Sequence, residues 1–290
     1  MHARAWLICV TLLAMNAAGM AASGAAQSRE PVTAILGAQT REISRLRDEL
    51  ADGKEHEILG IRFWQGRLAG RRAVIARMAS GKVNAAMVAT LAIEHFEPNE
   101  VIVTGIAGGL NPELGPGDLV IAERTVHHDV FRLRGSFVEY RGARDPVHGG
   151  RHPIFFEPPV YLLEAAQGAA KRAHFVPIAY KDRATSPHVV RVITGTVATG
   201  DSFIASDAKR DELRGEPLKA DAVEMEGAAV TQTCRQLEVP CLVIRCMSDL
   251  ATDAAIVELE TFADVAAANS ASLVREILRL LAEGESRSPR

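Results

Sequence analysis

Short apolar runs alternate with stretches of helical periodicity along most of the chain. The run PVTAILGA is predicted to be a buried strand that ends in a glycine turn, and Ile43, Leu46 and Leu50 follow with helical spacing. The same pattern predicts hairpin strands over 56–78, a helix over 82–96, two strands around a glycine-rich loop over 100–122, a helix over 160–173, a strand over 189–205, a helix over 227–237, a strand over 240–249 and a closing helix over 257–284.

This alternation predicts an α/β fold, with a single domain over residues 31–284. Its central sheet is expected to be mixed, mostly parallel and flanked by helices. Residues 131–160 interrupt the pattern because they are rich in glycine and proline, which predicts a long surface excursion or lid. The polar residues 285–290 are expected to form a frayed tail.

The first 26 residues have the layout of a secretory signal peptide. Arg4 precedes an apolar run from Ala5 to Met15, and small residues with predicted cleavage positions follow between Ala22 and Ala26. A retained membrane anchor is the alternative, but this run is shorter than the roughly 20 residues that a spanning helix needs. We therefore expect an exported, periplasmic protein without a stable membrane anchor.

Composition and charge narrow the choice of partner. The chain has 290 residues, of which 48% are hydrophobic and 24% charged, and this is ordinary for a globular protein. A formal net charge of −3 provides no basic field, so no nucleic-acid partner is expected. Three cysteines lie beyond the signal segment, and Cys241 and Cys246 fall on opposite faces of one predicted strand. We interpret all three, with Cys234, as small buried apolar residues rather than a disulfide framework.

The segment DAVEMEGAAV places two carboxylates in apolar surroundings. Glu224 and Glu226 flank Met225, and small apolar residues follow at once. An acid buried in such a place is costly unless partners compensate it. The hydroxyl groups of a bound ligand are one kind of partner that suits Glu226.

Other polar residues follow the predicted strands, where ligands of open α/β sheets collect. Each has a structural alternative: Glu42 as a solvated acid in a first helical turn, the segment GIAGG as a tight turn, and Asp249 as the cap of the next helix. Two more candidate positions follow predicted strands. Gly200–Asp201 leads to Phe203 and Ile204, and Ser248 lies beside Asp249.

These segments together resemble the methylthioadenosine/S-adenosylhomocysteine nucleosidases, within the wider nucleoside phosphorylase family. The resemblance extends from about residue 32 to about residue 283 and includes nearly the whole chain after the signal segment. Its most specific part is VEMEGAA followed by RCMSD. The other matching pieces, in chain order, are LGAQTRE, SGKVNAA, VTGIAGGLNPELGPGDLVIA, HHDV and TGDSFIA.

The resemblance implies a role for each candidate residue. On the base side, Phe203 stacks on the purine, the backbone of Ile204 contacts its edge, Asp249 protonates N7, and Ser248 holds Asp249. This arrangement fits the chemistry, because cleavage of an N-glycosidic bond builds negative charge on the departing base.

On the sugar side, the resemblance implies that Glu226 binds the ribose hydroxyls with Met225 packed against the ring. Glu224 lies beside them, Glu42 orients and deprotonates water, and Arg245 is close to the site. Binding the ribose in this way orients the anomeric carbon for attack.

The segment GIAGG is the clearest departure from the family pattern. Its residues Ile106, Ala107 and Gly108 are expected to contact the substrate, but the family usually has serine or threonine where this chain has Ile106. The excursion over 131–160 is longer than expected where relatives build the 5′-substituent pocket and subunit contacts. The resemblance implies a homodimer that acts on a purine nucleoside without a metal or another cofactor.

Three functions remain in competition. The leading hypothesis is a hydrolase that releases adenine from a 5′-modified adenosine. A phosphorylase of the same fold would need a phosphate site, for which Arg41 and Arg77 are candidates, although Glu42 would repel phosphate. An exported nucleoside-binding or storage protein needs no acid directed at N7, so the joint presence of Glu42, Glu226 and Asp249 favours an enzyme.

Overall fold

A computed structural model describes residues 30–178 and 188–287, and the side chains of 30–178 and 188–284. The chain divides into Met1–Glu30, of which Glu30 alone is described, and Pro31–Arg290, which carries the helices and strands. The predicted signal peptide therefore lies outside the described residues. Among the described residues, no helix is both long enough and apolar enough to cross a membrane.

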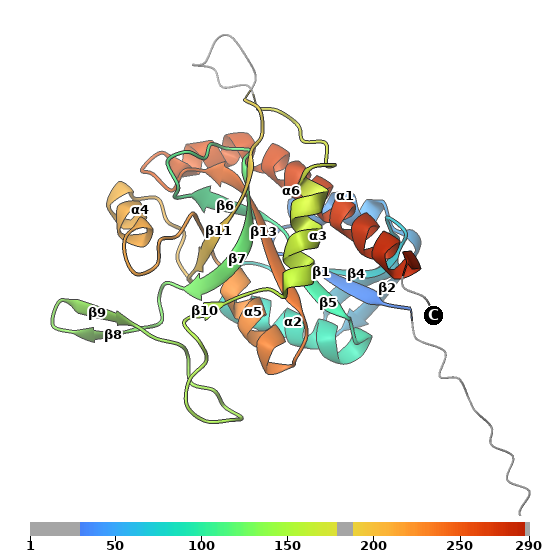
Figure 1. Ribbon diagram of the computed structural model, residues 1–290, viewed down its shortest axis with the longest axis horizontal. Helices are drawn as coiled ribbons and strands as arrows, with labels where there is room; N and C mark the ends of the chain where they lie inside the picture. The colour runs from blue at the N-terminus through green and yellow to red at the C-terminus, as the bar shows by residue number, and fades with distance from the viewer. Residues whose placement is uncertain (1–29, 179–187, 288–290) are drawn as a thin grey trace, which may run out of the picture. The chain divides into compact units, whose positions relative to one another are not determined.

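The α/β architecture predicted from the sequence is confirmed (Figure 1). The helices are α1 Thr40–Asp48, α2 Lys82–Phe96, α3 Val160–Ala170, α4 Asp207–Arg214, α5 Gly227–Gln236 and α6 Ala255–Arg287. The strands are β1 Val32–Gly37, β2 Ala51–Ile58, β3 Ile61–Leu68, β4 Arg71–Arg77, β5 Glu100–Val103, β6 Ile106–Gly109, β7 Leu119–His127, β8 Phe131–Arg134, β9 Phe137–Tyr140, β10 Phe155–Phe156, β11 Val192–Thr199, β12 Ala222–Glu224 and β13 Cys241–Asp249.

Within the described residues, eleven strands form the central sheet in the order β10-β7-β11-β12-β6-β13-β5-β1-β4-β3-β2. Strands β4, β1, β5 and β13 are mutually parallel where they pair, and β2, β3 and β12 supply antiparallel pairings. A further antiparallel pairing joins β7 to β13, which closes β7, β11, β12, β6 and β13 into a ring. The sheet is therefore mixed and mostly parallel at its centre, as expected.

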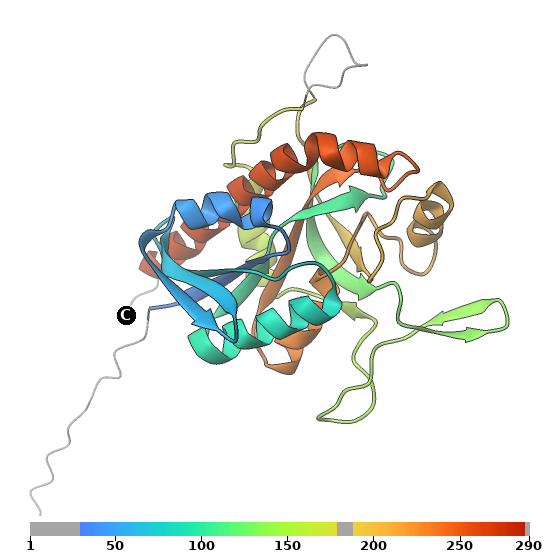
Figure 2. The ribbon, with the colours of Figure 1, turned by 180° about the vertical axis from the view of Figure 1, so that it is seen from behind.

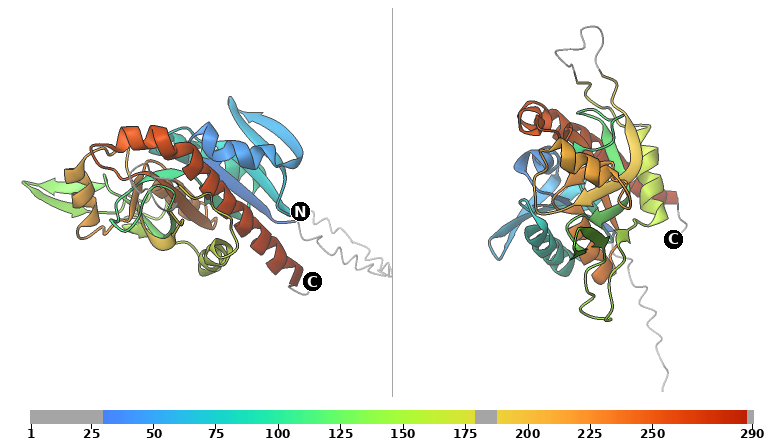
Figure 3. Two further views of the ribbon diagram at one scale, coloured as in Figure 1. Left: turned by 90° about the horizontal axis from the view of Figure 1, so that it is seen from above. Right: turned by 90° about the vertical axis from the view of Figure 1, so that its left-hand side faces the viewer.

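Helices cover both faces of the sheet (Figures 1 and 2). Apolar side chains of α2 and α5 pack on one face, and those of α1, α3 and α6 pack on the other. Helix α6 crosses its face diagonally (Figure 3). Cys241 belongs to the first cluster and Cys246 to the second, so the prediction of opposite faces is confirmed; the three described cysteines are free and buried.

Four features differ from the sequence expectations. All of the segment GIAGG except Gly105 forms strand β6 rather than a loop, because it pairs with both β12 and β13. The excursion over 131–160 contains the β8–β9 hairpin, which extends away from the sheet (Figure 1). The short polar helix α4 was not predicted. Helix α6 continues to Arg287, past the expected start of the frayed tail, because no glycine or proline stop follows Gly284 before Pro289.

Candidate active site

A cavity of about 140 Å³ lies where strands β1, β12 and β13 end. Because side chains from distant parts of the chain meet there, it is a candidate active site. Eight of the residues predicted from the sequence line it together with Glu42 and Asp249: Ile106, Ala107, Gly108, Phe203, Glu224, Met225, Glu226 and Ser248. Two predicted residues, Ile204 and Arg245, are outside its wall.

Glu42 is held at the start of α1. One carboxylate oxygen accepts a hydrogen bond from the Gln39 amide (2.7 Å) and the other from the Ile106 amide (3.0 Å). The side chain is 3% exposed, so the alternative of a solvated acid does not apply. Burial raises the pKa of Glu42, although the charge of Arg245 and the backbone amides oppose this effect.

Arg245 lies beneath the cavity wall as a buried cation. Its guanidinium donates to Glu224 through Nη2 (2.5 Å) and Nε (3.2 Å), and its Nη2 lies 3.6 Å from an oxygen of Glu226. Burial alone would lower the pKa of Arg245, but the carboxylates of Glu224, Glu226 and Glu42 raise it. One cation is therefore surrounded by three acids.

Glu224 has its oxygens occupied by protein donors. Besides Arg245, it accepts from the Thr199 hydroxyl and from the amides of Glu226 (2.9 Å) and Gly227 (2.8 Å) at the start of α5. Burial would raise the pKa of Glu224, but Arg245 and these hydrogen bonds hold it below its ordinary value. Glu224 is thus the ionised partner of Arg245 and anchors the amino end of α5.

Glu226 has fewer donors than Glu224. It accepts from the Gly81 amide (2.9 Å), and its other oxygen is the one 3.6 Å from Arg245. Burial, followed by repulsion from Glu224, raises the pKa of Glu226 to about 8. Near neutral pH Glu226 therefore retains a proton for much of the time, and its carboxyl group can both donate and accept hydrogen bonds.

Asp249 lies outside the Arg245 cluster. It accepts from the Ser248 hydroxyl (2.9 Å) and the Ala251 amide (3.0 Å), and it is 1% exposed. Burial raises the pKa of Asp249 despite these hydrogen bonds. The alternative that Asp249 caps the next helix does not hold, because α6 begins only at Ala255.

Two glycines of the segment GIAGG, Gly105 just before β6 and Gly108 within it, let these acids approach the sheet closely. A Cβ at Gly105 would lie 2.6 Å from a carboxylate oxygen of Glu42, and one at Gly108 would lie 2.9 Å from a carboxylate oxygen of Asp249. Neither contact is sterically allowed without a shift of the acid. The glycines are thus required by the position of the two acids, which explains why a glycine-rich segment serves as a strand here.

The remaining wall is apolar or small. Phe203 lines the cavity and is 47% exposed, whereas Ile204 is 9% exposed and packs in a separate apolar cluster with Val223. Sequence reasoning did not single out the following wall residues: Ala38, Gln39, Ser80, Val223 and Leu259. Ala38, Gln39, Ser80 and Val223 belong to matched segments and could have been included on that basis, but no local pattern indicates Leu259 at the start of α6.

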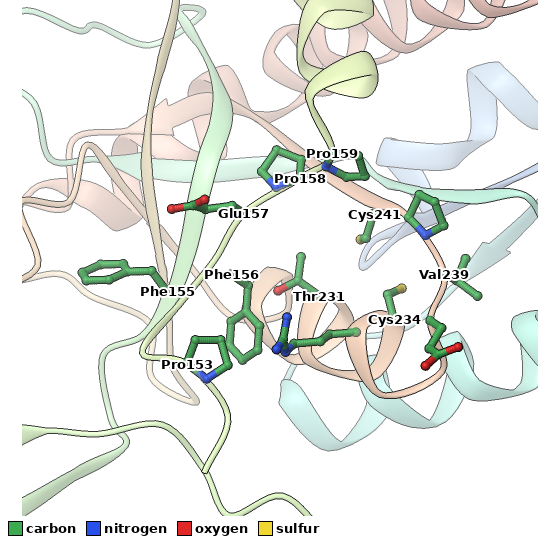
Figure 4. A pocket seen from close by; sticks show the side chains of 13 residues that line it. Pro153, Phe155, Phe156, Glu157, Pro158, Pro159, Thr231, Cys234, Val239 and Cys241 are labelled. Atoms are coloured by element: carbon green, nitrogen blue, oxygen red, sulfur yellow. The ribbon is translucent and has the colours of Figure 1, made fainter. Parts of the chain in front are cut away.

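A larger cavity of about 710 Å³ lies elsewhere, between the carboxyl end of α5, the start of β13 and the segment 153–159 (Figure 4). Cys234, Cys241, Thr231 and several prolines face it. It contains none of the acids with raised pKa values, so we assign the candidate active site to the smaller cavity, where the chemistry is concentrated.

Comparisons with known proteins identify the family to which the fold belongs. The model of the phosphorylase superfamily matches residues 32–279. A 5′-methylthioadenosine/S-adenosylhomocysteine nucleosidase of Geobacillus kaustophilus is 40% identical over 249 residues, which cover 86% of this chain and 97% of that protein. The chain therefore belongs to the phosphorylase superfamily and, within it, to the family of these nucleosidases.

Solved structures show the same relationship. The nucleosidase of Neisseria meningitidis, solved with methylthio-immucillin-A, is 36% identical with a TM-score of 0.73, over 86% of this chain and 98% of that chain. A futalosine hydrolase of Helicobacter pylori is 30% identical with a TM-score of 0.72, over 86% of this chain and 97% of that one. The shared architecture thus includes enzymes named for different nucleoside substrates.

Proposed function

We propose that the protein hydrolyses the N-glycosidic bond of 5′-modified adenosines, such as methylthioadenosine and S-adenosylhomocysteine, and releases adenine. The observation that carries the proposal is the presence of two kinds of acid in one cavity. Asp249 has a raised pKa and no contact with Arg245, while Glu42 and Glu226 lie around that cation. Acids in such different environments suit different roles.

In the proposed mechanism Asp249 donates its proton to N7 of the purine. The bond between C1′ and N9 then breaks with its electron pair on the base, and positive charge develops on the sugar. Glu226 binds the ribose hydroxyls, and water attacks C1′ while Glu42 takes its proton. The buried position of Asp249 supports the first step, because burial keeps a carboxyl group protonated and ready to donate.

A phosphorylase is the first alternative, and the charges of the cavity argue against it. Arg245 is the buried cation beside Glu42, Glu224 and Glu226, and Glu224 already binds it at 2.5 Å. Glu42 would also repel a phosphate, with a Coulomb energy of roughly 4 kcal/mol at 4 Å for an effective dielectric of 20. These observations favour water over phosphate as the attacking group.

The test is incubation of the protein with adenosine, methylthioadenosine and S-adenosylhomocysteine, with and without phosphate. Chromatography of the products should show adenine and the free sugar in both conditions. Strict dependence on phosphate, with a sugar 1-phosphate as product, would identify a phosphorylase. Binding of these nucleosides without any release of base would instead support the exported binding or storage protein.

We also propose that the protein is a homodimer. The β8–β9 hairpin extends from the sheet with Phe131, Leu133 and Phe137 between 44% and 65% exposed (Figure 2). Exposed apolar side chains grouped on one projecting element are typical of an interface. Light scattering after size exclusion should give twice the monomer mass, and a monomer at micromolar concentration would refute this part of the proposal.

Export of the protein to the periplasm is a separate proposal. It rests on the sequence pattern of residues 1–26 alone. Mass spectrometry of the protein recovered from its native host should give an amino terminus between Ser23 and Gln27. A chain that begins at Met1 in the cytoplasm would overturn it.

A further inference from the structure

Two cysteines meet between the end of α5 and the start of β13. Cys234 lies in the last turn of α5, and Cys241 is the first residue of β13. Both belong to the apolar cluster on the α2 and α5 face of the sheet, where they are at most 7% exposed. Both side chains also line the cavity of about 710 Å³ (Figure 4). Thiols from two different elements therefore converge on one place.

The short connection between α5 and β13 holds the two residues close. The Val239 amide donates to the Cys234 carbonyl at 2.8 Å, so the chain folds back directly after the helix. Cys241 follows two residues later, paired with Val101 of β5, and its side chain lies on the α5 side of the sheet. The Cys241 thiol is in hydrogen-bonding contact with the Cys234 thiol. Such convergence is what a disulfide requires, because its Cα atoms are at most about 7 Å apart.

Cys246 is separated from this pair by the sheet. It belongs to the apolar cluster on the opposite face, and its thiol donates to the Gly117 carbonyl at 3.1 Å. Cys9 lies within the predicted signal peptide. The three cysteines beyond that segment therefore divide into one neighbouring pair and one single thiol.

We propose that Cys234 and Cys241 form a disulfide bond in the exported protein and so fix the end of α5 to the start of β13. The two thiols give up two protons and two electrons, and the disulfide of an oxidising protein or of oxidised glutathione takes them up and becomes two thiols. The inference goes beyond the nucleosidase function. For its occurrence in the host it rests on the proposed export, because disulfides persist in oxidising compartments.

The bond is expected to form while the chain folds. Burial, together with the contact with Cys234, raises the pKa of the Cys241 thiol well above its ordinary value. Thiol–disulfide exchange needs a thiolate, so the folded protein should be oxidised slowly, and the buried bond should resist reduction once it has formed. Burial also raises the pKa of Cys246, which should remain a thiol.

Trypsin places the three cysteines on separate peptides, which makes the bond directly measurable. Arg235 lies between Cys234 and Cys241, and Arg245 lies between Cys241 and Cys246. Protein from the native host is alkylated under denaturing conditions without a reductant and then digested. Mass spectrometry should show the peptides of Cys234 and Cys241 joined by a disulfide, and Cys246 alkylated. The same protein, reduced and unfolded, should regain the joined peptides when it refolds with oxidised glutathione.

The bond should also appear in the unfolding temperature. Because it closes a loop of the chain, the oxidised protein should unfold roughly 5–10 °C above protein refolded with dithiothreitol. Cys234→Ala and Cys241→Ala should lose this difference between the two conditions. Cys246→Ala, which also removes a buried thiol from β13, is the matched control and should keep it.

Two results would overturn the inference at different points. Alkylation of all three cysteines after refolding with oxidised glutathione, or a bond that includes Cys246, would show that the pairing is wrong. Joined peptides after refolding, but three alkylated cysteines in the protein from the host, would show that the bond does not occur there. Neither result bears on the release of adenine, so the proposed nucleosidase function is decided separately by the nucleoside assay.

Discussion

Two buried arginines, among the residues that the structure describes, each bind a glutamate and differ in what surrounds them. Arg71 donates to Glu100 at 2.8 Å and to the Thr33 hydroxyl at 2.7 Å, at the amino ends of β4, β5 and β1. Arg245 donates to Glu224 at 2.5 Å, and Glu224 also accepts from the Thr199 hydroxyl, at the carboxyl ends of β11 and β12. Both pairs are at most 3% exposed.

The difference lies in the number of acids near each cation. Among the side chains that the structure describes, Arg71 binds one carboxylate, that of Glu100, so one positive charge faces one negative charge there. Arg245 influences Glu224, Glu226 and Glu42, and burial with mutual repulsion raises the pKa of Glu226 to about 8. A balanced buried pair is a structural element, whereas an excess of acids leaves protons to be exchanged with a substrate. Substitutions in the Arg71–Glu100 pair should therefore affect stability, and substitutions around Arg245 should affect activity.

The largest effect is expected for Asp249, which belongs to neither of the two arginine–glutamate pairs. Asp249→Asn keeps the shape of the side chain and removes its proton, so kcat should fall by about 10²–10⁴-fold while the protein stays folded. Because burial raises the pKa of Asp249, the amide resembles its native protonated form, and the unfolding temperature should not decrease. Asp253→Asn, on a nearby exposed position, is the control. Near-normal turnover of Asp249→Asn would remove Asp249 from the mechanism.

The balanced pair predicts the second largest effect, on stability. Arg71→Met leaves Glu100 buried without its cation, which typically costs about 3–5 kcal/mol and lowers the unfolding temperature by roughly 6–20 °C. The folded variant should retain kcat within about twofold at low temperature, since the pair is far from the cavity along β1. Scanning calorimetry measures the unfolding temperature, and adenine release at roughly 15–20 °C measures kcat.

A double variant tests whether the unpaired charge of Glu100 causes the loss of stability in Arg71→Met. Arg71→Met with Glu100→Leu replaces the pair by apolar side chains and should recover much of the lost stability. Arg245→Met, at the cluster with an excess of acids, should lower kcat even at temperatures where the variant is folded, although less than Asp249→Asn does. Equal loss of turnover in Arg71→Met and Arg245→Met would break the comparison between the two pairs.

Much of this arrangement was predictable from the sequence. The apolar runs and helical spacing predicted β1, α2 and β13, because each has a regular pattern that tertiary contacts do not override. Strand β6 was not predicted, because its glycines favour a loop locally and only pairing with β12 and β13 makes it a strand. Helix α4 was missed because it is polar and buries only Leu213.

The acids of the site were predictable as residues but not as protonation states. Glu224 and Glu226 have the same local context, two positions apart in one segment. What separates them is the position of Arg245, which donates to Glu224 at 2.5 Å and lies 3.6 Å from Glu226. Such a difference of about 1 Å depends on how β12 and β13 are placed on the two sides of β6, and no sequence pattern contains it.

The raised pKa of Glu226 gives a third, smaller prediction, on the pH dependence of stability. The unfolded chain releases this proton near the ordinary pKa of 4.5, whereas the folded protein retains it up to about 8. The contribution to stability is therefore full below pH 4.5 and is lost as pH rises through 8, at no more than about 1.4 kcal/mol per pH unit. Glu226→Gln should remove a decline of a few kcal/mol between these limits.

Urea unfolding at a series of pH values, followed by circular dichroism, measures this decline. The matched control is Glu94→Gln on an exposed position of α2, which should keep the slope of the unaltered protein. If Glu226→Gln keeps that slope too, Glu226 is ionised in the folded state at neutral pH. The contrast with the balanced Arg71–Glu100 pair would then have to rest on Glu42 alone.

The smallest effect is expected at Phe203, which belongs to the cavity but to neither charged pair. Its side chain is 47% exposed, so Phe203→Ala should change stability little, by about 0.5 kcal/mol at most. Stacking of an aromatic ring on a base is worth about 0.5–1.5 kcal/mol beyond buried area, so KM should rise roughly three- to tenfold. Because Asp249 and Glu42 are unchanged, kcat should remain within about twofold. Leu59→Ala removes an 86% exposed apolar side chain from the β2–β3 turn and is the matched control for both measurements. Steady-state kinetics with methylthioadenosine decide the outcome: a fall in kcat with an unchanged KM would mean that Phe203 positions the reacting bond rather than binding the base.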